Sequence, residues 1–297
     1  MPPLVLFGID VETDVGSFTP FYEGVRDGVP KLLDLFAKKG LPATFFFTGD
    51  AARRNPGAAR EAAREHEVGC HSLFHETLGD ELFPLPGVTP VLPEEVELRV
   101  RRATEWVADA SGRLPVSFRC PRLWGSTGVL NVLESLGYLC DASYPMYFYR
   151  RRFEPYHPDP SDWLQPGRMR ILEVPNFADM LMTSADPPLE RDRDHWPLFR
   201  TGDGSGIYRC VESFLRFTRE RGLRTVLCFY FHPWEFVPVR DRYDFGEATV
   251  LPHGFLTENC GDSALALLGR LADELKRMGC RFVRADELAR TWDANPG

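Results

Sequence analysis

The sequence predicts an α/β protein whose parallel strands close into a barrel. Short apolar runs of strand length alternate along the chain with longer amphipathic runs of helix length. The strand-like runs are apolar throughout, which indicates that both faces of the sheet are covered and that the strands pair in parallel. About seven such strand–helix units fit into the 297 residues, and this number favours a barrel over an open sheet.

The first half of the chain supplies five of these strands and the helices between them. We expect strands at 4–10, 42–48, 66–71, 116–119 and 138–141. We expect helices at 27–39, from about 50 to 65 with a break near Pro56, at 93–110 and at 126–137. Pro93 lies at a helix start, and Gly40 and Gly112 directly follow helix ends, as helix-terminal residues commonly do.

The second half of the chain continues the alternation with two interruptions. Strands are expected at 171–176, 225–232 and 281–285, with helices at 208–221 and 261–279. The stretches 143–170 and 180–207 are rich in Pro, Tyr, Trp and Asp, and we interpret both as long loops that could wall a site. The whole chain, 1–297, is expected to form a single catalytic domain.

Composition limits the classes of partner. The net charge of -8 and the pI of about 5.5 argue against nucleic acid or an anionic membrane, because both need a basic face. No stretch approaches the ~18 apolar residues of a transmembrane helix, and the first residues lack the basic start of a signal peptide. The seven cysteines are scattered without a CxxC pair, which is typical of buried thiols. A cytoplasmic location is therefore expected.

Titratable residues close five of the expected strands. They are Asp10, His71, Arg119, Asp141 and His232. The carboxyl ends of parallel strands open on the same face of a barrel, and active sites lie on that face. We therefore expect these five side chains to converge.

Two histidines four residues apart form the first candidate metal site. His71 and His75 would share one face of a helical turn and could hold Zn²⁺, or they could be two ordinary polar residues of a helix. A zinc site also needs an anionic ligand. Asp10 and Glu12 are two apart and point to the same side if the strand continues, so one could bind metal while the other takes a proton from water. The alternative for either carboxylate is a helix cap or a loop turn.

The two remaining strand ends also allow two interpretations. Arg119 could be a surface cation, or it could hold a carboxylate in its ionised form, with Asp141 anchoring the guanidinium. His232 could be a capped core residue, or it could donate a proton to a leaving group.

The ordered set resembles the motifs of the polysaccharide deacetylase family, also called the NodB-like or carbohydrate esterase 4 family. The matching segments are HSLFH (71–75), RCPR (119–122), DASYP (141–145) and FYFH, which ends at His232. The first motif, IDVETD, is closer to the Asp-x-Asp/Glu form of a subset than to the usual Asp-Asp pair. The resemblance spans residues 4 to about 290.

The resemblance implies a distorted (β/α)7 barrel of TIM-like type with a metal-dependent site. Glu12, His71 and His75 would bind Zn²⁺ or a similar ion, with Co²⁺, Ni²⁺ and Mn²⁺ also tolerated. Glu12 departs from the usual Asp, so Asp14 is a rival third ligand. Ser72 would support the site.

The resemblance also implies catalytic roles. Asp10 would be the general base, and His232 would be the general acid. Arg119, tethered by Asp141, would orient Asp10. The backbone N–H of Arg122 would help to stabilise the oxyanion.

The implied reaction is hydrolysis of a carbon–nitrogen amide bond. N-deacetylation or deformylation of an N-acyl aminosugar, such as a nucleotide- or lipid-linked one, fits the absence of a signal peptide. A cytosolic hydrolase of a ureide or cyclic imide would use the same residues. An inactive binding module would need a broken catalytic set, and the set is complete. Cytosolic relatives tend to assemble, so the resemblance also implies a homo-oligomer.

Overall fold

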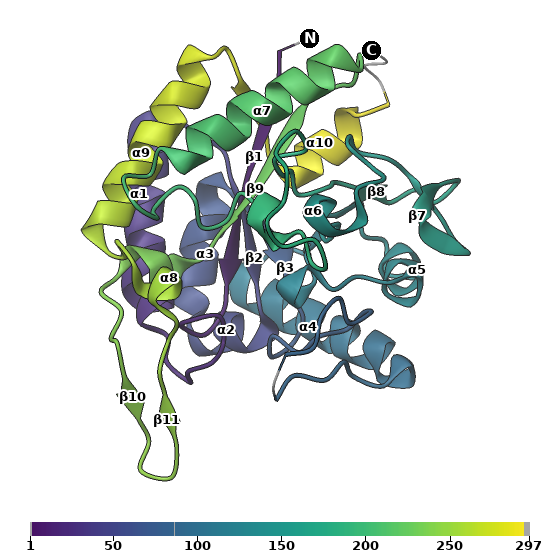
Figure 1. Ribbon diagram of the computed structural model, residues 1–297. Coiled ribbons are helices and arrows are strands. Elements are labelled where there is room, and N and C mark those ends of the chain that lie inside the picture. The colour runs from purple at the N-terminus through teal and green to yellow at the C-terminus, as the bar shows by residue number, and fades with distance from the viewer. Residues whose placement is uncertain (1, 86, 294–297) are drawn as a thin grey trace.

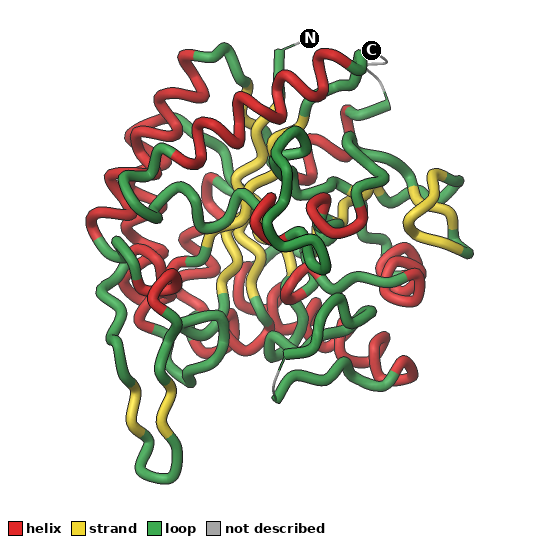
Figure 2. Tube along the Cα trace, viewed as in Figure 1, coloured by secondary structure: helices red, strands yellow, loops and turns green. Residues whose placement is uncertain are grey.

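A parallel sheet forms the centre of the computed structural model, which describes residues 2–85 and 87–293 (Figures 1 and 2). Its strands are β1 (Leu4–Val11), β2 (Thr44–Phe47), β3 (Glu67–Cys70), β4 (Ser117–Phe118), β5 (Cys140–Asp141), β8 (Leu172–Glu173), β9 (Val226–Phe231) and β12 (Arg281–Phe282). β1 to β5 and β8 pair in that order, and β9 pairs with the other edge of β1. A parallel bridge between Asn176 and Cys228 joins the β8 side to β9, so seven strands curl into a closed ring and the predicted α/β barrel is confirmed.

Helices surround this sheet (Figure 1). They are α1 (Val29–Lys39), α2 (Gly49–Arg54), α3 (Pro56–Glu65), α4 (Val96–Ser111), α5 (Thr127–Ser135), α6 (Met146–Tyr149), α7 (Gly206–Glu220), α8 (Gly254–Thr257), α9 (Asp262–Arg277) and α10 (Ala285–Thr291). The predicted ends hold: Gly40 and Gly112 adopt left-handed conformations after α1 and α4. Within the described ranges, no helix is both long and apolar enough to cross a membrane.

Alternation along the strands separates two apolar cores. Val5, Phe7 and Ile9 of β1 face the surrounding helices and belong to the larger core. Leu6 faces the interior of the barrel, where it joins Phe46 and several smaller side chains such as Cys140 and Val226. The period of two along a strand explains this division.

The inner core is closed by α10 at the end of the barrel where the strands begin, which is the upper end in Figure 1. Ala285, Leu288 and Trp292 of this helix pack with the inner-core residues. The closure leaves only the other end of the barrel, where the strands finish, free for a site.

The two predicted loops wall the carboxyl ends of the strands, and both contain local structure. The 143–170 segment holds α6 and a hairpin of β6 (Pro158–Asp159) and β7 (Asp162–Pro166). The 180–207 segment contains the 3-10 turn η4 (Arg191–Arg193). A further hairpin, β10 (Tyr243–Asp244) with β11 (Thr249–Val250), was not predicted and projects from the body (Figure 1).

A buried carboxyl group ties the amino ends of the strands to α10. Glu67 accepts hydrogen bonds from the hydroxyls of Thr44 and Ser117 and from the backbone N–H of Asp286. Burial and the nearby charge of Asp286 raise the pKa of Glu67 to about 7. The protonated form of Glu67 is therefore favoured in the folded protein.

We expect Glu67→Gln to flatten the pH dependence of stability. The folded pKa lies above the ordinary value of 4.5, so the contribution of Glu67 is complete below about pH 4.5 and is lost as the pH rises through about 7. The amide keeps one acceptor for Thr44 and Asp286 and can donate to Ser117. Urea unfolding at pH 5 and pH 8 should show wild type losing roughly 1–3 kcal/mol more than the variant over this interval. Glu61→Gln on the exposed face of α3 is the control, and equal slopes for all three proteins would contradict the expectation.

Candidate metal centre

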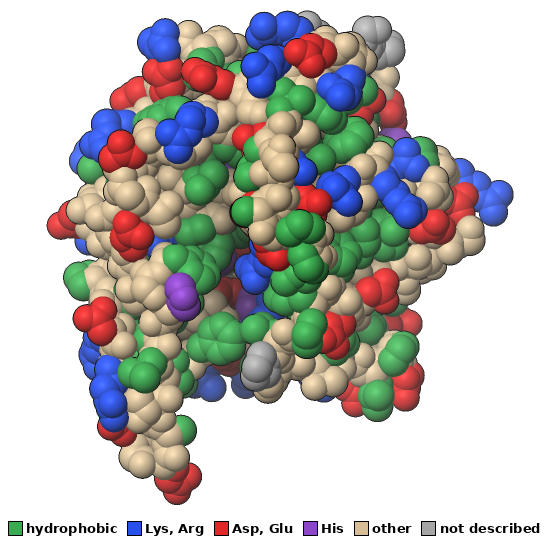
Figure 3. Space-filling view, in the orientation of Figure 1, with side chains coloured by type: hydrophobic (Ala, Val, Ile, Leu, Met, Phe, Trp, Pro, Cys, Tyr) green, Lys and Arg blue, Asp and Glu red, His purple; other side chains and the backbone are tan. Residues whose placement is uncertain are grey.

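Most of the predicted strand-end residues do meet in one pocket. It has a volume of about 330 Å³, and its polar members are Asp10, Glu12, His71, His75, Arg122, Arg191, Asp194 and His232. Figure 3 shows a hollow near the middle of this face, with basic, acidic and histidine side chains visible among hydrophobic ones. The convergence follows from the shared direction of the strands.

Glu12, His71 and His75 form a group that could hold a metal ion. Their ligand atoms all lie within 4.8 Å of one another. Oε2 of Glu12 lies 3.5 Å from Nε2 of His71 and 2.5 Å from Nε2 of His75. Neither carboxylate oxygen of this buried side chain has a partner with good hydrogen-bond geometry in the described part of the chain. A divalent cation would satisfy the carboxylate, and two imidazoles with one carboxylate are a usual zinc set.

The rings differ in how their second nitrogen is held. Nδ1 of His71 donates to the backbone carbonyl of Arg119 at 2.7 Å, which leaves the lone pair of Nε2 facing Glu12. Nδ1 of His75 accepts from Nη1 of Arg122 at 3.0 Å, because a guanidinium can only donate. If Nε2 of His75 bound a cation, the ring proton would lie on Nδ1, and Arg122 would lose this hydrogen bond.

The histidine motif is a tight loop, so the predicted helical turn is wrong. Ser72 and His75 both have left-handed backbones, with φ of 64°. Glu76 folds the loop by accepting from the backbone N–H of Leu73 and Phe74 and from the hydroxyl of Ser72. This turn brings the ring centres of the two imidazoles to 5.2 Å from each other.

Asp14, the rival third ligand, is engaged elsewhere. Its carboxylate accepts from the backbone N–H of Glu23 at 2.8 Å and of Gly24 at 2.9 Å. These bonds stabilise the start of a π-helical turn, η1 (Gly24–Gly28), and burial raises the pKa of Asp14 to about 6. Glu12 is therefore the better candidate ligand.

A buried ion pair holds Asp10 beside this group. Nη1 of Arg119 donates to Oδ1 of Asp10 at 2.8 Å, and neither side chain is appreciably exposed. The guanidinium also donates to the carbonyls of Ala142 and Phe229. A Cβ on Gly8 would lie 2.2 Å from Nη1 of Arg119, so this position must be glycine for the guanidinium to cross the barrel.

Asp141 does not tether Arg119, which corrects the predicted role. Strand register places Phe118 beside Asp141 and Asp141 beside Glu173, all on the outer face of the sheet, whereas Arg119 points inward. No hydrogen bond joins Arg119 to Asp141 in the part of the chain that the structure describes. Asp141 instead accepts from the hydroxyl of Ser143 at 2.7 Å, so it supports the backbone next to the site.

The sequence analysis missed Glu173 on this outer face. It accepts from the backbone N–H of Ser143 and Tyr144. Burial and the charge of Asp141 raise its pKa well above the ordinary value. Burial also raises the pKa of Asp141, to about 6. A hydrogen bond between the two carboxyl groups raises the pKa of Glu173 and lowers that of Asp141, so Glu173 is the one that keeps the proton.

His232 has a partner that the sequence analysis also missed. Its Nδ1 donates to Oε1 of Glu235 at 3.0 Å, and Glu235 is buried against Arg200 and the indole N–H of Trp196. Burial alone would lower the pKa of His232, but the hydrogen bond to Glu235 and the charge of Glu12 raise it above its ordinary value. The signal in the sequence was an acid three residues after the histidine, in HPWE.

The sequence of residues 16–140 matches the family model of polysaccharide deacetylases, so the resemblance inferred from the motifs is confirmed over less than half of the chain. The peptidoglycan-N-acetylglucosamine deacetylase of Bacillus cereus is 26% identical over 48% of this chain and 57% of its own length. The corresponding enzyme PgdA of Listeria monocytogenes is 31% identical over 34% of this chain and 20% of its own length. A chitooligosaccharide deacetylase of Rhizobium leguminosarum bv. trifolii is 26% identical over 53% and 60%. The chain thus matches at most 60% of the length of these relatives.

Solved structures agree with the fold over nearly the whole chain. A Mycobacterium smegmatis protein, itself a proposed polysaccharide deacetylase, superposes with a TM-score of 0.64 at 18% identity, covering 99% of this chain and 91% of its own. Puue allantoinase gives the same TM-score at 16% identity, with the same coverage. At these identities the likeness establishes the fold alone.

We expect Gly8→Ala to weaken the fold by displacing Arg119 from Asp10. The added methyl group would overlap the guanidinium, and overpacking of a core typically costs ~1–3 kcal/mol. Urea unfolding measures the loss. Gly57→Ala is the control, because its Cβ would meet nothing within 4 Å and alanine favours a helix. A Gly8→Ala protein as stable as wild type, with Arg119 unmoved in a crystal structure, would contradict the packing argument.

In Glu235→Gln, the pKa of His232 should fall. The amide removes the negative charge and weakens the hydrogen bond that favour the imidazolium, so burial dominates. NMR titration of the histidine ring resonances measures this shift. Glu258→Gln is the control, because this carboxylate accepts from the backbone N–H of Gly202, and only the backbone carbonyl of Glu258 accepts from Arg200. The interpretation would fail if both variants left the titration of His232 unchanged.

Proposed function

We propose that this protein is a metal-dependent hydrolase of carbon–nitrogen amide bonds that removes an acetyl or formyl group from an N-acyl aminosugar-containing substrate. The main support for this proposal is that Asp10, which the buried Arg119 holds in place, lies in the same pocket as His232 and the candidate metal ligands Glu12, His71 and His75. The deacetylase activities named for the relatives support the same reaction. We further propose that the chain works as one catalytic domain.

Glu12, His71 and His75 would hold the cation. A divalent ion in this set supplies a Lewis acid that polarises an amide carbonyl and favours deprotonation of water. Zn²⁺ suits the two-imidazole, one-carboxylate set, and Co²⁺, Ni²⁺ or Mn²⁺ can replace it.

The residues around this group would then handle the protons. Asp10, held by Arg119, accepts a proton from the attacking water. His232 donates a proton to the departing amine, and Glu235 favours the charged imidazole that this step needs. The backbone N–H of Arg122 would help to stabilise the developing oxyanion.

Two other functions use the same pocket. Hydrolysis of a ureide or cyclic imide needs the same base, acid and cation, and the small volume of the pocket suits such substrates. A binding module without catalysis is the weaker alternative, because Asp10, the Glu12 group and His232 are all in place.

We expect one zinc or similar ion per wild-type chain purified without chelator. His75→Ala should lose it, because one of three ligands is gone. His253→Ala, on the exposed surface, is the control and should keep the ion. Inductively coupled plasma mass spectrometry measures the content. A wild-type protein that takes up no ion after soaking with Zn²⁺ or Co²⁺ would favour the binding module.

Asp10→Asn should keep the ion and lose about 10²–10⁴-fold in rate, the usual range for a general base. The assay is release of acetate or formate from N-acetyl and N-formyl aminosugars, run beside ureides to separate the two hydrolase functions. Asp27→Asn, outside the pocket, is the matched control. If Asp10→Asn retained full activity on whichever substrate the wild type hydrolyses, Asp10 could not be the base.

A further inference from the structure

The pocket of the metal centre is compact and its walls are largely apolar. Around the polar centre lie seven aromatic side chains: Phe18, Phe83, Tyr147, Trp196, Tyr230, Trp234 and Phe255. A volume of about 330 Å³ is at the low end for small-molecule sites. The pocket therefore suits a compact group about the size of one sugar ring, which can pack against aromatic faces.

Two arginines on the walls lack an acidic partner. Arg122 and Arg191 both line the pocket, and within the described ranges neither has a carboxylate oxygen within 4.0 Å. The guanidinium carbon of Arg122 lies 5.6 Å from the ring centre of Phe18, and that of Arg191 lies 4.6 Å from that of Phe83. Aromatic support of this kind orients a guanidinium and leaves its N–H donors free for a planar anion.

The other charges of the pocket offset these two arginines only in part. Asp10 is neutralised by Arg119, and Glu12 faces two imidazoles. Asp194 is the remaining acid on the wall; it accepts the hydroxyl of Tyr230, and although burial raises its pKa, the charge of Arg191 acts to lower it, so Asp194 offsets part of the charge of Arg191. A divalent cation at Glu12 would add further positive charge, so the loaded pocket would carry an excess of positive charge.

Arg122 becomes available when a cation is bound. Its Nη1 donates to Nδ1 of His75, a bond that disappears if His75 ligates through Nε2. Arg122 lines the pocket and also donates from Nη1 to the backbone carbonyl of His75 at 3.4 Å, whereas Arg191 lines the pocket with an exposed side chain.

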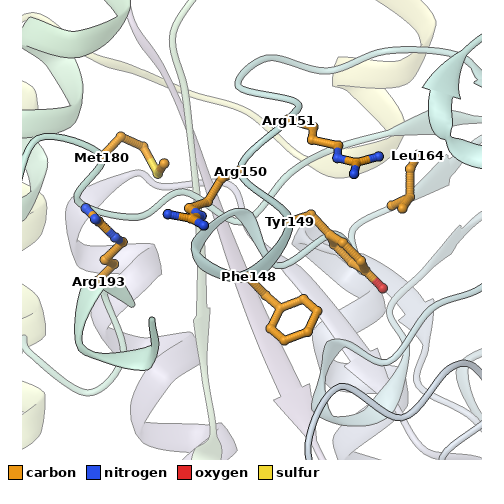
Figure 4. Close-up of a pocket in the computed structure, with 7 residues that line it drawn as sticks. All are labelled: Phe148, Tyr149, Arg150, Arg151, Leu164, Met180 and Arg193. Atoms are coloured by element: carbon orange, nitrogen blue, oxygen red, sulfur yellow. The ribbon is translucent and has the colours of Figure 1, made fainter. Parts of the chain in front are cut away.

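A second hollow, of about 750 Å³, serves as a contrast (Figure 4). It is lined by Arg150, Arg151 and Arg193 with Phe148 and Tyr149, and Figure 4 shows the guanidinium of Arg150 directed toward that of Arg193. Both of these arginines pair with Glu190. One carboxylate therefore offsets the charge of only one of these two arginines, and the hollow holds none of the candidate metal ligands.

We propose that the substrate is a compact N-acyl amino compound that carries an anionic group, a carboxylate or a phosphate, and that Arg122 and Arg191 bind this group. The inference rests on the proposed function for the place of the scissile amide. It adds a charge requirement that a neutral glycan chain does not meet. Planar or tetrahedral anions suit paired guanidinium groups because the N–H donors bond in pairs.

Isothermal titration of the zinc-loaded protein tests the proposal with three probes. They are neutral N-acetylglucosamine, N-acetylglucosamine 1-phosphate and N-acetylmuramic acid, which carries a carboxylate. We expect one of the two anions to bind at least tenfold more tightly than the neutral sugar, and the preferred one identifies the anion. Arg191→Gln should remove about tenfold of that advantage and leave the neutral sugar unchanged, and Arg191→Lys should restore part of it.

Arg151→Gln is the matched control, because this arginine lies in the second hollow and should change none of the affinities. Titration of the metal-free protein separates the two proposals, because the part of the preference that depends on Arg191 should persist without the cation. Equal affinities for all three probes, or an equal loss for neutral and anionic probes in Arg191→Gln, would overturn the inference while leaving the hydrolase proposal intact. Binding selectivity without turnover of any amide would overturn the hydrolase proposal alone.

Discussion

The buried pair of Asp10 and Arg119 is the constraint on which the functional end of the barrel depends. A guanidinium with no solvent contact must give its N–H groups to protein acceptors, and Arg119 finds them on three other strand segments, at Asp10, Ala142 and Phe229. Breaking such a pair typically costs ~3–5 kcal/mol, because one charge is then left buried alone. The same bonds that hold β1, β5 and β9 together thus fix the carboxylate that the proposed chemistry needs, and Gly8 leaves the space for them.

The barrel interior is divided along its axis by this pair. Toward the amino ends of the strands, apolar side chains and α10 fill the interior. Toward the carboxyl ends, the inward-facing side chains are titratable. Charged groups at the carboxyl ends of the strands are partly shielded from water by the aromatic walls of the pocket, which strengthens the electrostatic interactions between them. Stability and chemistry are therefore supplied by different segments of the same strands.

Sequence patterns predicted the strands and the pocket well, because burial on both faces makes a strand apolar and a polar residue at its end then stands out. Asp10, His71 and His232 were found in this way, and Glu12 and His75 followed from their spacing to the first two; all five line the pocket. The face of Asp141 was not predictable, since β4 and β5 pair over only two residues and a shift by one residue reverses the face. The left-handed turns of the histidine loop leave no periodic pattern, and Glu173 acts through contacts with a segment about 30 residues away in the sequence.

Between β8 and β9 the ring of strands is closed by one residue, Asn176, through a single backbone bridge and its side chain. Asn176 contributes one bridge to Cys228, while its amide group donates to Ala142 at 2.8 Å and its Oδ1 accepts from the thiol of Cys228 at 3.5 Å. The two long loops, 143–170 and 180–207, lie directly before and after Asn176 in the sequence. Because one asparagine closes the barrel at this place, the loops on either side can accept insertions without changing the register of any other strand pair. Changes in substrate specificity are therefore most easily introduced in the loops next to Asn176. The strands on the other side of the barrel pair through continuous hydrogen-bond ladders and keep the proposed catalytic residues in place.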